Sequence, residues 1–180
     1  MKKFIALFVF ALSSASLMAQ SDGHRGLDYK VDFGYDFSTK SGGPKTISAT
    51  GIIGKRINDY LFVGGGSGAY MDQETVEDGN KHTYVPIFAD FRGYYPLGAI
   101  TSISPFLGVK GGYVINAVSS KGSDYYMFQI TPGVQIPLSG VIDLNVAVGY
   151  ECWMPTMSEL KNLNFIALRL GFGFHKNSKK

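Results

Sequence analysis

The most regular pattern in the chain is the alternation of apolar and polar residues in Leu27–Phe37, "LDYKVDFGYDF". Every second position is apolar or aromatic: Leu27, Tyr29, Val31, Phe33, Tyr35 and Phe37. Between them stand Asp28, Lys30, Asp32, Gly34 and Asp36. A period of two residues predicts a β-strand with two unlike faces.

Seven further segments show the same alternation with turn residues between them. They cover residues 46–55, 60–71, 82–95, 105–116, 125–138, 142–154 and 163–174. Most are longer than the five or six residues typical of soluble strands, and they suit a tilted strand that crosses an outer membrane in about 9–11 residues. The glycines of "YLFVGGGSGAYM" leave the facing of the third segment ambiguous. No linker or domain boundary interrupts the series.

The composition of the two faces indicates which one is outside. A soluble lipocalin-like barrel would turn its apolar face inward and cover its surface with Lys, Glu and Thr. Here the face opposite the apolar one is rich in glycine and carries nearly balanced charges, which suits a crowded barrel interior. The apolar face has no charge in the middle of its segments, and aromatic residues stand near their ends, as in the girdles of outer-membrane barrels.

An apolar face in contact with lipid requires that no strand edge be left unpaired in hydrocarbon. The sequence therefore predicts an all-β fold, an eight-stranded antiparallel up-and-down transmembrane β-barrel. The start of the chain, "MKKFIALFVFALSSASLMAQ", predicts a signal peptide over residues 1–19 and a barrel domain over residues 20–180. The net charge of +3 offers no basic excess for nucleic acid.

With these features the chain resembles the small eight-stranded outer-membrane β-barrel proteins, the family of outer membrane protein X and the barrel domain of outer membrane protein A. The resemblance is carried by the signal peptide, the eight segments, and the stretches "VPIFADFRGYY", "SPFLGVKGGY" and "LRLGFGF". It implies a monomer in outer-membrane lipid with periplasmic termini. It also implies a structural or adhesive role through the extracellular loops, with residues 72–81 and 155–162 as the candidate contacts for a ligand or surface partner.

The polar residues of the inner face are expected to form a structural network that fills the lumen, because eight strands leave little free space. These residues are Asp28, Lys30, Asp32, Asp36, Asp90, Arg92, Lys110, Gln129, Gln135, Glu151 and Arg169. We expect Lys110 to meet Asp90 across the fourth and fifth segments, and Arg169 to approach Asp32 where the barrel closes. An ion or proton path is the functional alternative to this plug.

Two other functions remain open at this stage. A lipid-active enzyme at the outer rim would have to use His82 with Asp72, Glu74, Glu77 and Asp78, but an acidic solvated loop is the better interpretation, so no catalytic activity is expected. A soluble periplasmic barrel with an apolar ligand inside is the other alternative. The loop "DQETVEDGN" lacks the spacing of an EF-hand, and we expect no cofactor or metal.

Overall fold

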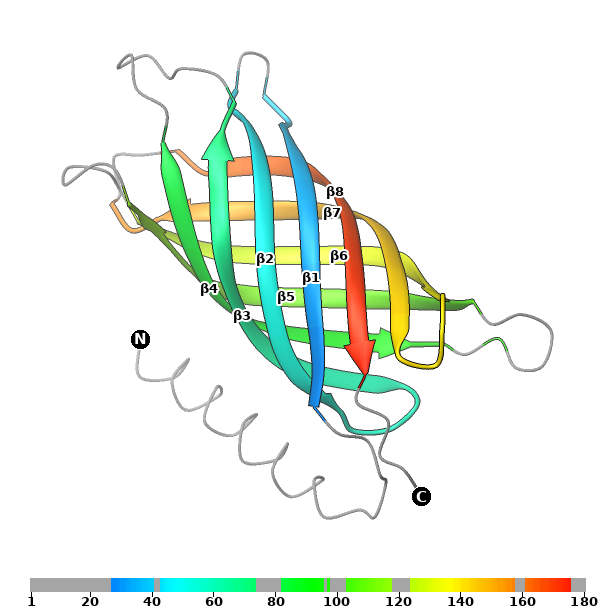
Figure 1. The fold of residues 1–180 in the computed structure, drawn as a ribbon. Coiled ribbons are helices and arrows are strands. Elements are labelled where there is room, and N and C mark those ends of the chain that lie inside the picture. The colour runs from blue at the N-terminus through cyan, green and yellow to red at the C-terminus, as the bar shows by residue number, and fades with distance from the viewer. Residues whose placement is uncertain are drawn as a thin grey trace.

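The computed structural model describes residues 27–40, 43–73, 82–95, 97, 103–117, 124–157 and 161–175. These residues form eight antiparallel strands that close into one barrel in sequence order (Figure 1). The strands are β1 (Leu27–Ser38), β2 (Lys45–Arg56), β3 (Leu61–Asp72), β4 (Thr83–Tyr94), β5 (Ser104–Asn116), β6 (Tyr125–Pro137), β7 (Ile142–Pro155) and β8 (Leu163–His175). The predicted fold class is confirmed. The predicted signal peptide lies outside the described residues and stays a prediction.

Closure depends on the pairing of the first and last strands. β8 pairs with β1 from Asp28 opposite His175 to Ser38 opposite Phe165, so the sheet has no free edge between them. β1 begins and β8 ends at the same end of the barrel (Figure 1), which we call the terminal end. The opposite end, where β1 leads into β2 and β3 ends at Asp72, is called the loop end.

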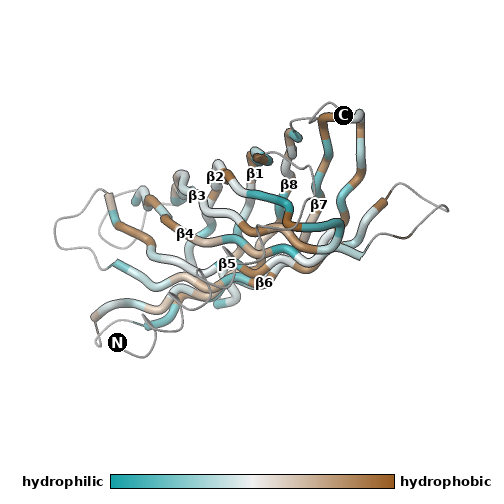
Figure 2. The backbone as a smooth tube through the Cα atoms, turned by 90° about the horizontal axis from the view of Figure 1, so that it is seen from below, coloured by the Kyte–Doolittle hydropathy of each residue, from teal (hydrophilic) through white to brown (hydrophobic). Residues whose placement is uncertain are grey.

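The two faces of the sheet have opposite chemistry, as the alternation predicts. Large apolar side chains lie on the outside, with Phe33 50%, Ile87 58% and Leu168 49% exposed. The charged residues between them are buried inside. Brown and teal segments follow one another along several of the strands in Figure 2. A soluble barrel would need the reverse arrangement, so the alternative with an apolar ligand inside is wrong. No helix among the described residues is long and apolar enough to cross a membrane.

Glycines on the inner face make room for the side chains that fill the lumen. A Cβ atom on Gly34 would collide with the guanidinium of Arg169, and one on Gly112 would collide with the carbonyl oxygen of Ile87. On the outer face, a Cβ atom on Gly111 would meet nothing within 4 Å. The inner glycines are therefore a packing requirement of the interior.

Candidate functional site in the barrel lumen

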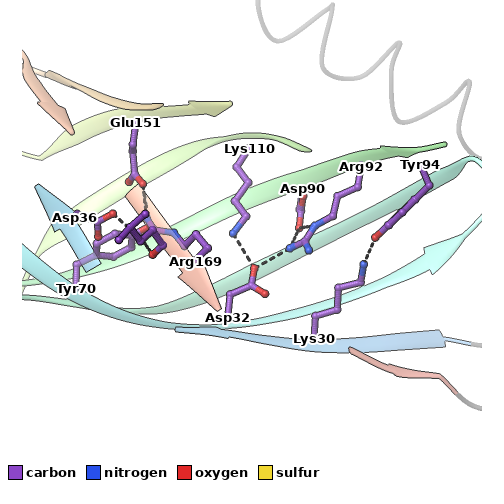
Figure 3. A network of polar contacts seen from close by, with 11 residues as sticks. Lys30, Asp32, Asp36, Tyr70, Asp90, Arg92, Tyr94, Lys110, Glu151 and Arg169 are labelled. Carbon is purple, nitrogen blue, oxygen red and sulfur yellow. Dashed lines mark hydrogen bonds and ion pairs between the residues drawn. The ribbon is translucent and has the colours of Figure 1, made fainter. Parts of the chain in front are cut away.

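The structure places all the predicted lumen residues inside the barrel. Each of these side chains is buried, with between 0% and 7% of its surface exposed: Asp28, Lys30, Asp32, Asp36, Asp90, Arg92, Lys110, Gln129, Gln135, Glu151 and Arg169. These residues belong to different strands, and they lie close together because the inward positions of neighbouring strands are adjacent in a closed sheet. Ten polar and aromatic residues of this interior are labelled in Figure 3.

The middle of the lumen holds two acids and two bases. Arg92 donates from Nη2 to Asp32 Oδ2 at 2.7 Å and from Nε to Asp90 Oδ2 at 2.9 Å, while Lys110 Nζ donates to Asp32 Oδ2 at 3.2 Å (Figure 3). Asp32 comes from β1, and the other three residues come from β4 and β5 across the lumen. We call these four residues the central cluster.

The predicted meeting of Lys110 with Asp90 is confirmed in register only, since the two Cα atoms pair directly between β4 and β5. The ammonium group, however, donates to Asp32 on the opposite wall. Asp90 is bound instead by Arg92, which lies two residues away on the same face of β4. The long lysine side chain can cross the narrow lumen, so the neighbour in register is not its partner.

Near the loop end, Arg169 lies between two acids. Its Nη1 is 2.6 Å from Asp36 Oδ1, and its Nη2 is 2.7 Å from Glu151 Oε2 (Figure 3). Glu151 also accepts a hydrogen bond from Trp153 Nε1 at 2.6 Å, and Asp36 accepts one from Thr46 Oγ1 at 3.1 Å. Each carboxylate therefore accepts a hydrogen bond from a neutral side chain in addition to its contact with the shared guanidinium.

The predicted pairing of Arg169 with Asp32 is wrong. In the register of closure Arg169 stands opposite Gly34, and Asp32 stands opposite Gly171. The absence of a side chain at Gly34 lets the guanidinium lie against β1 and reach Asp36. Asp32 is already held by Arg92 and Lys110 from the other wall.

At the terminal end, His175 joins the first, seventh and eighth strands. Its Nδ1 is 3.0 Å from Asp28 Oδ1, and its Nε2 contacts Asp143 Oδ2. Arg56 donates from Nη2 to Gln135 Oε1 at 2.9 Å, and the amide of Gln135 donates to Asp143. The predicted lumen network did not include His175, Asp143 or Arg56, although all three are in phase with inward residues of their strands.

Lys30 is held differently from the other bases. Its Nζ donates to the hydroxyl of Tyr94 at 2.5 Å (Figure 3). The same atom lies 3.9 Å from the centroid of the Phe62 ring. An ammonium over an aromatic face is attracted by the ring quadrupole. The lumen thus stabilises cations with aromatic rings as well as with carboxylates.

The loop end of the lumen is closed by a group of five aromatic side chains, which we call the aromatic layer: Tyr70, Tyr84, Tyr125, Trp153 and Phe165. Trp153 is 1% exposed, and its ring centroid lies 5.2–5.7 Å from those of the other four. This layer was not among the predicted lumen residues, because large apolar residues were expected on the lipid face. The inward facing of Trp153 could be read from the sequence, because Trp153 lies two residues after Glu151 and therefore on the same face of the strand.

The free space beside the central cluster is small. A cavity of about 10 Å³ lies among Asp32, Asp90, Lys110, Thr131 and Asn145, which is room for about one water molecule. Within the described part of the chain, the amide of Gln129 and that of Asn145 have no hydrogen-bond partner. Ordered water is the usual partner of such buried amides.

The suggested enzyme cluster is only partly within the described residues. His82 Nδ1 lies 3.2 Å from the hydroxyl of Tyr84, and the backbone N–H of Asp72 donates to the carbonyl of His82 at 3.0 Å. Glu74, Glu77 and Asp78 lie outside the described residues. Across the strands and turns that the structure describes, no three His, Cys, Asp or Glu residues are grouped so as to hold a metal ion.

Comparisons with known proteins give a match at the level of the fold. No family model and no curated protein matches the sequence. The structure of Neisserial surface protein A matches with a TM-score of 0.66 and 18% identity, over 86% of this chain and 100% of that one. The outer membrane enzyme PagL matches with a TM-score of 0.56 and 12% identity, over 81% of this chain and 98% of that one.

A third match is the outer membrane protein OprG from Pseudomonas aeruginosa, with a TM-score of 0.53 and 15% identity over 87% of this chain and 99% of that one. The chain therefore has the fold of the small eight-stranded outer-membrane β-barrels. This fold and the exposed apolar belt together indicate the outer membrane as its location, with lipid as its surroundings.

Proposed function

We propose that this protein is a closed, monomeric outer-membrane barrel that acts through its extracellular loops, in a structural or adhesive role. The observation that supports the proposal is the series of ion pairs in the lumen, which runs from the terminal end to the aromatic layer. The cavity beside the central cluster, about 10 Å³ in volume, is far too small for a solute. If no solute passes through the lumen, the protein can interact with its surroundings through the loops at the loop end.

We also propose that the lumen network is a structural plug. Buried charges are costly unless they are paired and hydrogen-bonded. The central cluster and the Arg169 pairs meet this requirement with distances of 2.6–3.2 Å. In this proposal the network joins opposite walls of the barrel and holds its cross-section.

The proposed orientation of the barrel in the membrane follows from the export of its N-terminus to the periplasm. Residues 1–19 are removed as a signal peptide, the terminal end faces the periplasm, and residues 72–81 and 155–162 face the outside. No catalytic activity is proposed, because His82 Nδ1 is engaged with the hydroxyl of Tyr84. The fold alone does not decide this point, since one structural neighbour is an enzyme.

The closed lumen is tested by solute uptake. The purified protein is reconstituted into liposomes, and swelling in a small sugar is compared with liposomes that contain a large porin and with empty liposomes. We expect swelling equal to that of the empty liposomes. Swelling that rises with the amount of barrel would overturn the plug.

The role of the loops is tested on whole cells. Residues 73–81 and residues 156–162 are replaced, in separate variants, by Gly/Ser segments of the same length. The control replaces Ser139–Val141, a turn at the terminal end, in the same way. We expect adhesion of the cells to coated surfaces to fall in at least one loop variant and to persist in the control, with all variants still shifting on a gel when boiled. Unchanged adhesion in both loop variants would refute the role.

A further inference from the structure

The starting observation is the position of the His175 ring at the terminal end of the lumen. His175 is the last residue of β8, and its ring lies between two buried carboxylates from the strands on either side. Nδ1 is 3.0 Å from Oδ1 of Asp28 on β1, and Nε2 contacts Oδ2 of Asp143 on β7. The imidazole therefore joins the last strand to both of its neighbours.

The contacts of the two ring nitrogens indicate the charge of the imidazole. A neutral imidazole has one N–H group and one lone pair, whereas the imidazolium ion has two N–H groups. Both nitrogens of His175 face a carboxylate oxygen, and an ionised carboxylate only accepts hydrogen bonds. A neutral ring would turn its lone pair toward one of the two acids. The arrangement therefore fits the imidazolium ion, which donates to both.

A second base and an amide complete the contacts of the two acids. Arg56, the last residue of β2, has its Nε 3.8 Å from Oδ2 of Asp28 and donates from Nη2 to Oε1 of Gln135 at 2.9 Å. Gln135 on β6 donates from Nε2 to Oδ2 of Asp143. Residues of five strands are thus linked around the His175 ring.

The balance of charge at this end depends on the proton of His175. Asp28 and Asp143 are matched by Arg56 and the imidazolium, whereas a neutral ring would leave one buried acid without a base. Lys30, the next inward residue of β1, donates instead to the hydroxyl of Tyr94. The inward residue that precedes His175 on β8 is a glycine and adds no charge.

We propose that protonated His175 is a clasp that closes the terminal end of the barrel, and that loss of its proton releases the clasp. The ring lies where the pairing of β8 with β1 ends, at Asp28 opposite His175. Its own backbone N–H donates to the carbonyl of Val141 at 2.9 Å, which fixes the residue against the neighbouring turn. The proposal requires only the closed barrel, so it does not depend on the proposed role of the loops.

The clasp predicts a pH dependence of stability with a definite sign. An unperturbed histidine loses its proton around neutral pH. In the clasp, the folded protein holds on His175 a proton that the unfolded chain releases, so the stability that the clasp supplies is lost as the pH rises. A side chain that only fills space would lower the stability when it is replaced, without changing this pH profile.

The profile is measured by urea unfolding in lipid vesicles at about pH 6 and about pH 10. We expect the unfolding equilibrium constant of the wild type to rise about tenfold or more beyond the rise in His175→Gln. Groups that titrate elsewhere are common to both proteins. The control, His82→Gln, removes a histidine at the loop end and should keep the wild-type profile. Equal profiles of His175→Gln and wild type would overturn the clasp.

Two carboxylate variants test the partners of the ring. Asp143→Asn keeps the shape of the side chain and removes one of the two charges, so its pH response should lie between those of wild type and His175→Gln. Asp59→Asn removes an exposed carboxylate from a turn at the same end and should keep the full response. A full response in Asp143→Asn would show that one carboxylate suffices and would contradict the clasp.

The charge of the ring is observed directly by NMR of histidine-labelled protein in detergent micelles, because the ring ¹⁵N shifts of imidazolium differ from those of the neutral tautomers. The chain contains three histidines. His175→Gln assigns the His175 signal by its loss, and if that variant does not fold, His24→Gln and His82→Gln assign it by elimination. We expect both ring nitrogens to be protonated at neutral pH. A neutral tautomer at that pH would refute the clasp.

Discussion

Replacing Arg169 with methionine would remove the guanidinium that Asp36 and Glu151 share inside the membrane-spanning part of the barrel. The two acids are 1% and 0% exposed, and each lies within 2.7 Å of an Arg169 nitrogen. Methionine keeps a long apolar side chain and creates little new space. The perturbation is therefore mainly electrostatic.

The expected loss can be worked from these contacts. Removing one partner of a buried ion pair costs about 3–5 kcal/mol, because the remaining charge stays buried and uncompensated. Here two carboxylates lose their partner at once. Thr46 and Trp153 still donate to them and moderate the loss. We expect Arg169→Met to lower the free energy of unfolding by about 3–5 kcal/mol.

The assay is urea unfolding of the barrel in lipid vesicles, with the fraction folded read from the unboiled band on a gel. The control variant combines Arg169→Met with Asp36→Asn and Glu151→Gln, so that no buried charge is left alone. Because neutral groups with incomplete hydrogen bonds cost about 1–3 kcal/mol, this variant should be more stable than Arg169→Met alone. The reasoning would be refuted if Arg169→Met unfolded at the wild-type urea concentration, or if the triple variant were no more stable than the single one.

Three further predictions use the same unfolding assay. Leu168→Arg places a charge on the lipid face and should cost about 2–4 kcal/mol near the midplane, so a harmless result would contradict the outward facing of this residue. Gly112→Ala should impair folding because its Cβ would meet the backbone of β4, whereas Gly111→Ala should fold normally, and equal behaviour of the pair would argue against the packing described here. Trp153→Ala should cost about 3–5 kcal/mol through loss of the centre of the aromatic layer, and a loss below about 1 kcal/mol would show that the layer is loosely packed.

The sequence by itself determined the strands, their facing and the class of fold. Alternation is a local property, because each residue of a strand points to the opposite side from its neighbour. The eight segments therefore predicted the strand limits to within a few residues, and the inward positions of Asp28 to Arg169 followed from phase alone. The third segment was the exception, since its glycines hid the inward facing of Phe62 and Tyr70.

Only the tertiary structure decided which side chains meet inside. Lys110 binds Asp32 across the lumen rather than its neighbour Asp90, and Arg169 binds Asp36 and Glu151 rather than Asp32. Contacts across the lumen depend on the stagger of the strands at closure and on the reach of long side chains. The local alternation of residues predicts neither of these quantities. Phase alone gives the inward facing of Trp153, but the contacts of its ring with four others exist only because five separate strands are brought together.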